Sequence, residues 1–299
     1  MALPGKSAGS CDLGSQPIRT RRNARTAPEP SPALVPSDEW LSVSSDEDRM
    51  ARAGIKLRGG GPHQSKTMML VELTTLFVNR GADKPTDAII RDNVLAKPSM
   101  RARQAALCRL RQLYGVGETW PICLIFRRLW DRNPLGRPLL AVLCALARDP
   151  SLRAGASAVL DASPGEHVRW PLIAAAFETR HPGRLGEKMA KSLAQNAASS
   201  WTQAGFLEGA VNKKRVRAQP TPAVAAYAAL IGTLCGFGGM RLIECRWLDV
   251  LDRPAEDRLA LLRQAEGLGL ARVRSAGDVL DIEVRRPMAN ILRVPEIVG

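Results

Sequence analysis

The chain has no apolar segment long enough to cross a membrane. Its longest candidate, residues 223–235, contains a glycine and a threonine and is shorter than the roughly 18 residues that a spanning helix needs. We therefore expect a buried helix there and no membrane partner. The start of the chain also lacks a basic segment followed by an apolar one, so we expect no secretory signal.

Cysteine is sparse and scattered. The 299 residues include six cysteines, and no two of them have the spacing of a zinc-binding pair. A disulfide scaffold or a zinc finger is therefore not expected. Unpaired cysteines are typical of a reducing compartment, so the predicted location is the cytoplasm.

Residues in catalytic or cofactor-binding patterns are also missing. The three histidines (63, 167 and 181) have no partner at metal-ligand spacing, and no Gly-x-Ser-x-Gly segment occurs. With five Phe and two Tyr, no aromatic surface typical of RNA-binding domains is visible. We predict a protein that is not an enzyme, with no catalytic residues, no metal and no cofactor.

Residues 60–67 come close to a phosphate-binding loop. Ser65 stands where that loop has a glycine, and Pro62 removes an N–H group that would face a phosphate. A flexible hinge before a helix is the simpler interpretation. The enzymatic alternatives are nucleotide hydrolysis and a metal-dependent nuclease, whose candidate carboxylates are dispersed (Glu72, Asp83, Asp87 and Asp92).

Acidic residues are too few to balance the basic ones. The chain has 43 Lys and Arg against 29 Asp and Glu, a formal charge of +14. Residues 97–137 hold nine basic and two acidic residues, and residues 180–218 hold eight basic and two acidic ones. Clustered positive charge is typical of a polyanion partner. Nucleic acid is the leading interpretation, and the alternatives are an acidic protein surface or an arginine-rich composition with no polyanion partner.

Composition divides the chain into three parts. Residues 1–55 are rich in Pro, Ser and charge, which predicts a disordered tail. Helical periodicity then predicts an N-terminal helical domain over residues 56–162 and a winged-helix-like C-terminal domain over residues 163–299.

The N-terminal domain contains an Arg-rich helix. Ser99 predicts the N-cap of a helix that continues to Tyr114, and its apolar side chains share one face. Arg103 falls on the apolar side. The basic residues on the opposite arc, which we predict to contact nucleic acid, are Lys97, Arg101, Arg109 and Arg111.

The second basic segment has the order of a winged helix-turn-helix. A helix over residues 163–179, a turn, a helix ending near residue 203 and a basic hairpin follow one another. In that motif the second helix enters the major groove and the wing contacts phosphates. Trp201 lies on the apolar face and is predicted to be a core residue, with base stacking as the alternative. The predicted groove-facing residues are Lys188, Lys191, Gln195, Ser199 and Gln203, and those of the wing are Lys213, Lys214, Arg215 and Arg217.

A second hairpin is predicted near the end of the chain. A helix over residues 254–268 precedes two strands, at 270–274 and 279–285, which alternate apolar and charged side chains. This hairpin carries both signs of charge, so we predict a structural element or a less basic second wing. The predicted fold class is mainly α: a helical bundle with winged helix-turn-helix-like elements and one or two short β-hairpins.

Three segments follow one another in a recognisable order. They are residues 59–61 followed by KTMMLVEL at 66–73, then IRDNVLAK at 90–97 before the Arg-rich helix, and AASSWTQAGFL at 197–207 before the basic stretch. In this order they resemble the BrxA family of BREX phage-defence systems. The resemblance covers about residues 55–285. It implies a mostly helical, non-catalytic, DNA-binding accessory protein that works beside other components of a defence complex. BrxA proteins have been likened to the RNA-binding antiterminator NusB, so RNA remains an alternative ligand, and the long N-terminal tail departs from the compact members of the family.

Taken together, the residues predict a non-enzymatic, BrxA-like protein that binds duplex DNA mainly through basic patches. The alternatives are a protein-assembly adaptor within a defence complex and a NusB-like RNA-binding protein. Homo-oligomer formation is left open.

Overall fold

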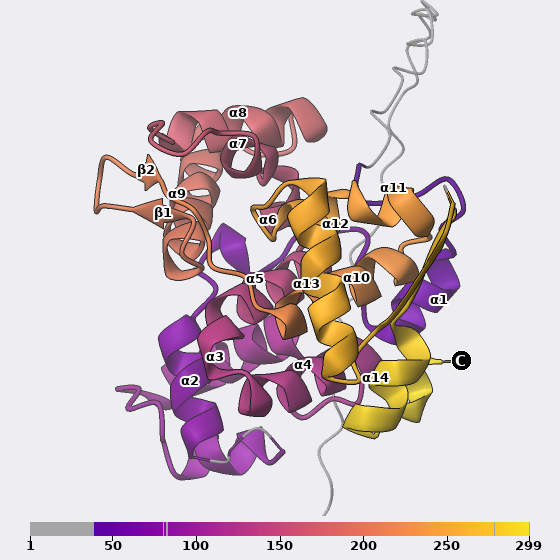
Figure 1. Ribbon diagram of the computed structural model, residues 1–299. Helices are drawn as coiled ribbons and strands as arrows, with labels where there is room; N and C mark the ends of the chain where they lie inside the picture. The colour runs from indigo at the N-terminus through magenta and orange to yellow at the C-terminus, as the bar shows by residue number, and fades with distance from the viewer. Residues whose placement is uncertain (1–38, 80, 82, 278, 299) are drawn as a thin grey trace, which may run out of the picture. The chain divides into compact units, whose positions relative to one another are not determined.

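Two apolar helices lie at the centre of the fold (Figure 1). The computed structural model describes residues 39–79, 81, 83–277 and 279–298. Helices α5 (Arg137–Arg148) and α10 (Pro222–Leu234) are buried almost all the way round, as expected for helices that are apolar on every side. Thr221 caps α10 by accepting a hydrogen bond from Val224 N, and Pro222 occupies its first turn. The buried helix predicted over residues 223–235 is confirmed.

The first part of the chain surrounds α5. Tyr114 stacks on Phe126 with ring centroids 5.5 Å apart, and Phe77 and Trp130 complete an aromatic cluster between α2, α3 and α4. Ser99 caps α3 as predicted, by accepting from Ala102 N. The elements of this part are α1 (Glu47–Ala53), η1 (Pro62–Gln64), α2 (Leu70–Val78), the π-helical turn η2 (Asp87–Arg91), α3 (Met100–Tyr114), α4 (Pro121–Arg132), η3 (Pro134–Gly136) and α6 (Pro150–Ala154).

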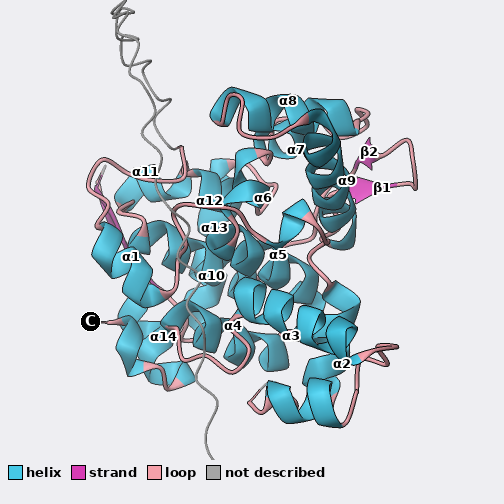
Figure 2. Ribbon diagram, turned by 180° about the vertical axis from the view of Figure 1, so that it is seen from behind, coloured by secondary structure: helices cyan, strands magenta, loops and turns pink. Residues whose placement is uncertain are grey.

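The second part adds two groups of elements, one that precedes α10 in the chain and one that follows it (Figures 1 and 2). One group is α7 (Ser157–Leu160), α8 (Trp170–Arg180), α9 (Glu187–Gln203), β1 (Leu207–Glu208) and β2 (Lys214–Arg215). The other is α11 (Gly239–Ile243), α12 (Arg246–Asp249), α13 (Ala255–Gly267), β3 (Arg272–Ala276), β4 (Val279–Glu283), α14 (Arg285–Leu292) and η4 (Pro295–Ile297). The fold class predicted from the sequence, mainly α with short β-hairpins, is therefore confirmed.

The predicted terminal hairpin forms, but its first strand lies two residues later in the chain than predicted and its second strand ends at Glu283 instead of residue 285. Strands β3 and β4 are antiparallel, with Arg272 opposite Glu283 and Arg274 opposite Asp281. These opposite charges face each other across the strands, which stabilises the hairpin. The hairpin therefore has little net charge, which favours the structural interpretation over a second wing.

The helix predicted to begin at residue 163 begins instead at Trp170. Ser163 N does donate to Glu166 Oε2, the local contact on which the prediction relied. Residues 166–168, however, are not helical, because they follow a turn at Gly165 (φ +97°) and their backbone pairs with β2. A tertiary pairing thus overrides a local helix-start signal.

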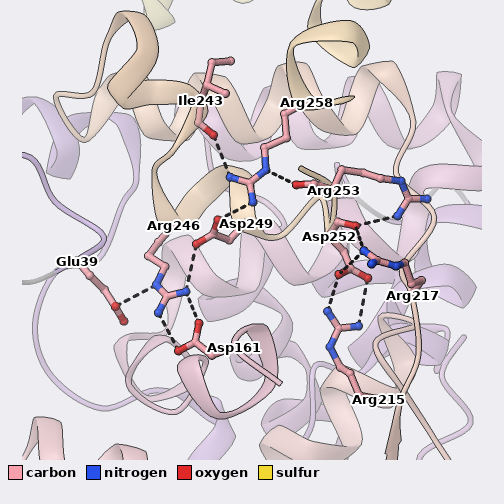
Figure 3. Close-up of polar contacts among 10 residues, drawn as sticks. All are labelled: Glu39, Asp161, Arg215, Arg217, Ile243, Arg246, Asp249, Asp252, Arg253 and Arg258. Carbon is pink, nitrogen blue, oxygen red and sulfur yellow. Dashed lines mark hydrogen bonds and ion pairs between the residues drawn. The ribbon is translucent and has the colours of Figure 1, made fainter. Parts of the chain in front are cut away.

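Residues 39–55, which composition assigns to the tail, pack onto the folded body. Trp40 is 1% exposed and its ring lies edge-on to Trp247, with centroids 4.7 Å apart. Glu39 pairs with Arg246, which also binds Asp161 and Asp249 (Figure 3). Met50 and Ile55 of this segment are also buried. The polar composition of the segment as a whole hid these few apolar anchors. Residues 1–38 of the predicted tail lie outside the described residues.

The main hydrophobic cluster includes residues from both sides of the predicted domain boundary at 162/163. Val159 and Leu152 precede it and Val168 and Ile173 follow it, all in the same cluster. The described residues belong to one compact unit by their contacts. The two predicted domains therefore share a core where they meet.

Replacing Trp40 by alanine tests whether residues 39–46 belong to the fold. The change removes a buried indole and its contact with Trp247, so we expect the free energy of unfolding to fall by about 3–5 kcal/mol in urea titrations. Val43→Ala is the control, because Val43 is 98% exposed, and it should change stability by less than about 0.5 kcal/mol. Equal effects of the two variants would show that this segment does not contribute to the core.

Candidate nucleic-acid interface

Helices α8 and α9 and the hairpin β1–β2 are arranged like a winged helix-turn-helix. Leu207 pairs with Arg215 and Glu208 with Lys214 in the hairpin. Residues 165–168 lie on the other side of β2, with Gly165 N donating to Arg215 O at 2.8 Å and Arg215 N donating to Glu166 O at 2.8 Å. These residues, β2 and β1 thus lie in that order. Helices α8 and α9 pack against each other and lie between residues 165–168 and β1 in the chain. This matches the element order that the sequence predicts.

Helix α9 presents one buried and one open face. Leu193, Ala197 and Trp201 are buried on the inner face, so Trp201 is a core residue, as predicted. Lys188, Lys191 and Gln195 are exposed on the outer face, and Ser199 is half-buried there. Four of the five residues predicted to face a groove therefore share one open stripe of the helix.

Gln203, the fifth, is engaged in the fold. Its side-chain oxygen accepts a hydrogen bond from Leu70 N at 3.0 Å. Asn196 and Ser192 lie on the same side of α9 and donate to the carbonyls of His63 and Gln64. This side of the helix holds the segment around η1, so Gln203 is a packing residue and the prediction for it is wrong.

The wing residues have different surroundings. Lys214 is exposed on β2. Lys213 is half-buried and donates to Thr202 Oγ1 at 2.8 Å and to Gly209 O at 3.3 Å, and burial lowers the pKa of its ammonium group. Arg217 is exposed and donates to the carbonyl of Asp252 (Figure 3). Among the wing cations, Lys214 is thus the one whose side chain makes no hydrogen bond or ion pair with another described residue.

Arg215 does not face solvent. It is 2% exposed, and its guanidinium forms two bonds to the carboxylate of Asp252, at 2.7 and 3.2 Å (Figure 3). Its Nε donates to Val159 O, and the ring of Phe206 lies 4.8 Å from the guanidinium carbon. The prediction that Arg215 binds phosphate is therefore wrong. Side chains alternate along a strand, so a neighbour of the exposed Lys214 has to point inward.

The basic residues of α3 are partly neutralised within the protein. Lys97 pairs with Glu72 at 3.0 Å, and Arg111 pairs with Glu118 at 3.3 Å. Arg101 is exposed and Arg109 is half-buried, and neither has a side-chain bond to another described residue. Helices α3 and α9 each contact η1. Of the four predicted residues, Arg101 and Arg109 are the ones whose charge is available to a ligand.

Arg103, which the sequence places on the apolar side of the same helix, is half-buried. Its guanidinium donates to the carbonyl of Ile90 in η2 at 2.9 Å. It therefore holds α3 to η2.

The sequence analysis missed a buried Ser–His–Asp arrangement. His63 Nδ1 lies 2.8 Å from Asp149 Oδ2, and His63 Nε2 lies 2.9 Å from Ser200 Oγ. A catalytic triad has the same contacts. Here all three residues have no exposed surface, and the Ser200 hydroxyl donates to Asn196 O while accepting from Met68 N.

These bonds make the arrangement a structural link. The two ring nitrogens of His63 connect Asp149 on one side with Ser200 on the other, inside the fold. The pair joins α9 to η1 and to the start of α6, which positions the outer face of α9. No sequence pattern could reveal it, because 86 and 137 residues separate His63 from its two partners.

The described residues contain no cluster of three or more His, Cys, Asp or Glu that could hold a metal ion. None of their helices has both the length and the apolar character needed to span a membrane. Searches with the chain found no matching family model, curated protein or solved structure. The resemblance to the BrxA family therefore stays a prediction.

Arg215 and Lys214 should differ in how much each contributes to the free energy of unfolding. Arg215→Ala leaves Asp252 without its bidentate partner, so we expect a loss of about 3–5 kcal/mol in the free energy of unfolding. Lys214→Ala should change it by less than about 0.5 kcal/mol, because the side chain is exposed. Chemical denaturation of both variants checks this, and similar values would contradict the inward position of Arg215.

The buried pair should make stability depend on acid. Burial alone would raise the pKa of Asp149, but hydrogen bonds from His63 and Ser151 outweigh it and lower the pKa below its usual value. The stabilisation is therefore complete above about pH 4 and declines as the pH falls further. Asp149→Asn should cost about 3–5 kcal/mol at pH 7, and less as the pH drops below about 4. Urea titrations at several pH values check this. A difference in the free energy of unfolding between the unaltered protein and Asp149→Asn that stays the same at every pH would refute it.

Proposed function

We propose that this protein binds duplex DNA through the outer face of α9 and the wing between β1 and β2. The observation that carries the proposal is the open stripe of Lys188, Lys191, Gln195 and Ser199 on α9, together with the exposed Lys214 of the wing. A helix with an outward polar stripe fits the major groove, and an adjacent hairpin can contact the flanking phosphates.

Charge supports an anionic partner at this face. Lys188, Lys191 and Lys214 are exposed and make no ion pair with another described residue. Contacts between such side chains and phosphates give affinity but no sequence information. The proposed binding is therefore mainly independent of sequence, and Gln195 and Ser199 supply the hydrogen-bonding groups that can reach base edges.

The helix geometry favours DNA over double-stranded RNA. The major groove of A-form RNA is too narrow and deep for side chains to read, whereas that of B-form DNA admits an α-helix. A non-enzymatic role in the cytoplasm, as an accessory protein beside other components of a phage-defence complex, is the wider proposal that the BrxA resemblance suggests.

Removing the three open lysines tests the interface. In fluorescence anisotropy with the full chain and a short duplex, Lys188→Ala, Lys191→Ala and Lys214→Ala together should weaken binding to all sequences alike. The log–log salt slope should fall by about 2 to 3, because each lost phosphate contact removes nearly one unit.

A matched control removes the same charge elsewhere. Arg128, Arg263 and Arg286 are exposed on α4, α13 and α14, which lie away from α9 and the wing in both views (Figures 1 and 2). Their joint replacement by alanine should leave the salt slope within about half a unit. Equal losses in the two triple variants would point to a diffuse charge effect, and no binding by the unaltered protein would favour the adaptor alternative.

A further inference from the structure

A groove runs between α9, the wing and the first turn of α8. It has a volume of about 300 Å³ and is lined by Val168, Trp170, Gln195, Ala198, Ser199, Ala210, Val211 and Lys213. Five of these eight residues are apolar or aromatic. A groove of this kind with a few convergent polar groups is typical of a small-ligand site, and its size is at the lower end of that range.

Two of the three polar side chains of the groove are available to a ligand, since only Lys213 is bound within the protein. Gln195 and Ser199 are neighbours on the open stripe of α9, and neither side chain forms a hydrogen bond with another described residue. A carboxamide offers both a donor and an acceptor, and a hydroxyl offers the same from a single atom. Together they match the alternating donors and acceptors along the edge of a nucleobase.

The apolar walls fit a flat heterocycle. Trp170 is half-buried at the start of α8, and the Lys191 ammonium group lies 5.3 Å from its ring centroid. Val211 is 88% exposed at the rim, where water would otherwise surround it. Aromatic rings and apolar side chains are the surfaces on which unstacked bases lie in single-strand-binding and base-extruding proteins.

We propose that this groove binds one unstacked nucleobase, and that the protein therefore prefers duplex DNA containing an unpaired nucleotide over a fully paired duplex. The inference rests on the proposed function, since the surrounding lysines hold the phosphates on either side. Gln195 and Ser199 bind the base edge, and Trp170 and Val211 contact its faces. A fully paired duplex has no base free to enter the groove without breaking a pair.

The test compares two probes with the full chain. One is a labelled matched duplex, and the other is the same duplex with a single extra, unpaired thymine in its centre. We expect the second to bind about fivefold to a hundredfold more tightly, the range for stacking one base on a protein surface. With 5-iodouracil at the unpaired position, irradiation should crosslink the probe to the peptide containing Trp170.

Variants separate the groove from the lysines. Gln195→Ala with Ser199→Ala changes two side chains that form no hydrogen bond with another described residue, so the protein should remain folded. The double variant should lose affinity for the probe with the unpaired thymine by a larger factor than for the matched duplex, so that most of the preference disappears. Trp170→Ala should lose the preference and Trp170→Phe should retain it. Lys188→Ala with Lys214→Ala should weaken binding to both probes by the same factor and leave the preference intact.

Two results would overturn the inference. Equal affinity for the two probes, without a crosslink at Trp170, shows that the groove takes no base, and the proposed binding of duplex DNA survives. No binding of either probe at low salt overturns the inference together with the proposed function.

Discussion

The placement of α9 depends on one buried hydrogen-bonded pair, between His63 and Asp149. Both side chains are removed from water, so each needs the other and its hydrogen-bond partners to remain inside the fold. The fit is tight, because a Cβ on Gly61 would come within 2.0 Å of the Asp149 carboxylate. Ser200 connects the pair to α9. Because Ser200 faces the pair, the opposite face of α9 points to solvent. That outward face is the candidate interface.

A second buried pair, between Arg215 and Asp252, holds the wing in place. Arg215 is fixed to Asp252, whose carboxylate also accepts from Ala218 N, so β2 is fastened to the loop that leads into α13 (Figure 3). Basic residues in this protein therefore divide into two groups. Arg215 and Arg246 hold segments together through carboxylates, and Lys188 and Lys214 stand open on the surface. The formal net charge includes both groups, but only the exposed second group can bind a polyanion.

Much of the fold could be predicted from the sequence. The apolar face that contains Trp201 is the buried side of α9, as predicted, and the alternation of apolar and charged residues identified the hairpin β3–β4. The errors occurred where a distant partner changed a local preference. Residues 165–168 look like a helix start but pair with β2, and residues 39–55 look like a tail but carry Trp40 into a hydrophobic contact with Trp247.

The sequence by itself determined which side of each helix is apolar, because that information repeats every three to four residues along the chain. Tertiary structure decided which polar side chains remain open to a ligand. Gln203 and Lys188 are both polar residues that the sequence places on the polar side of α9. Only Gln203 bonds to the backbone of Leu70, which is 133 residues away from it in the chain. Such partners meet only when the helices pack, so the groove beside Trp170 is a property of the packed structure and has no signature in the sequence.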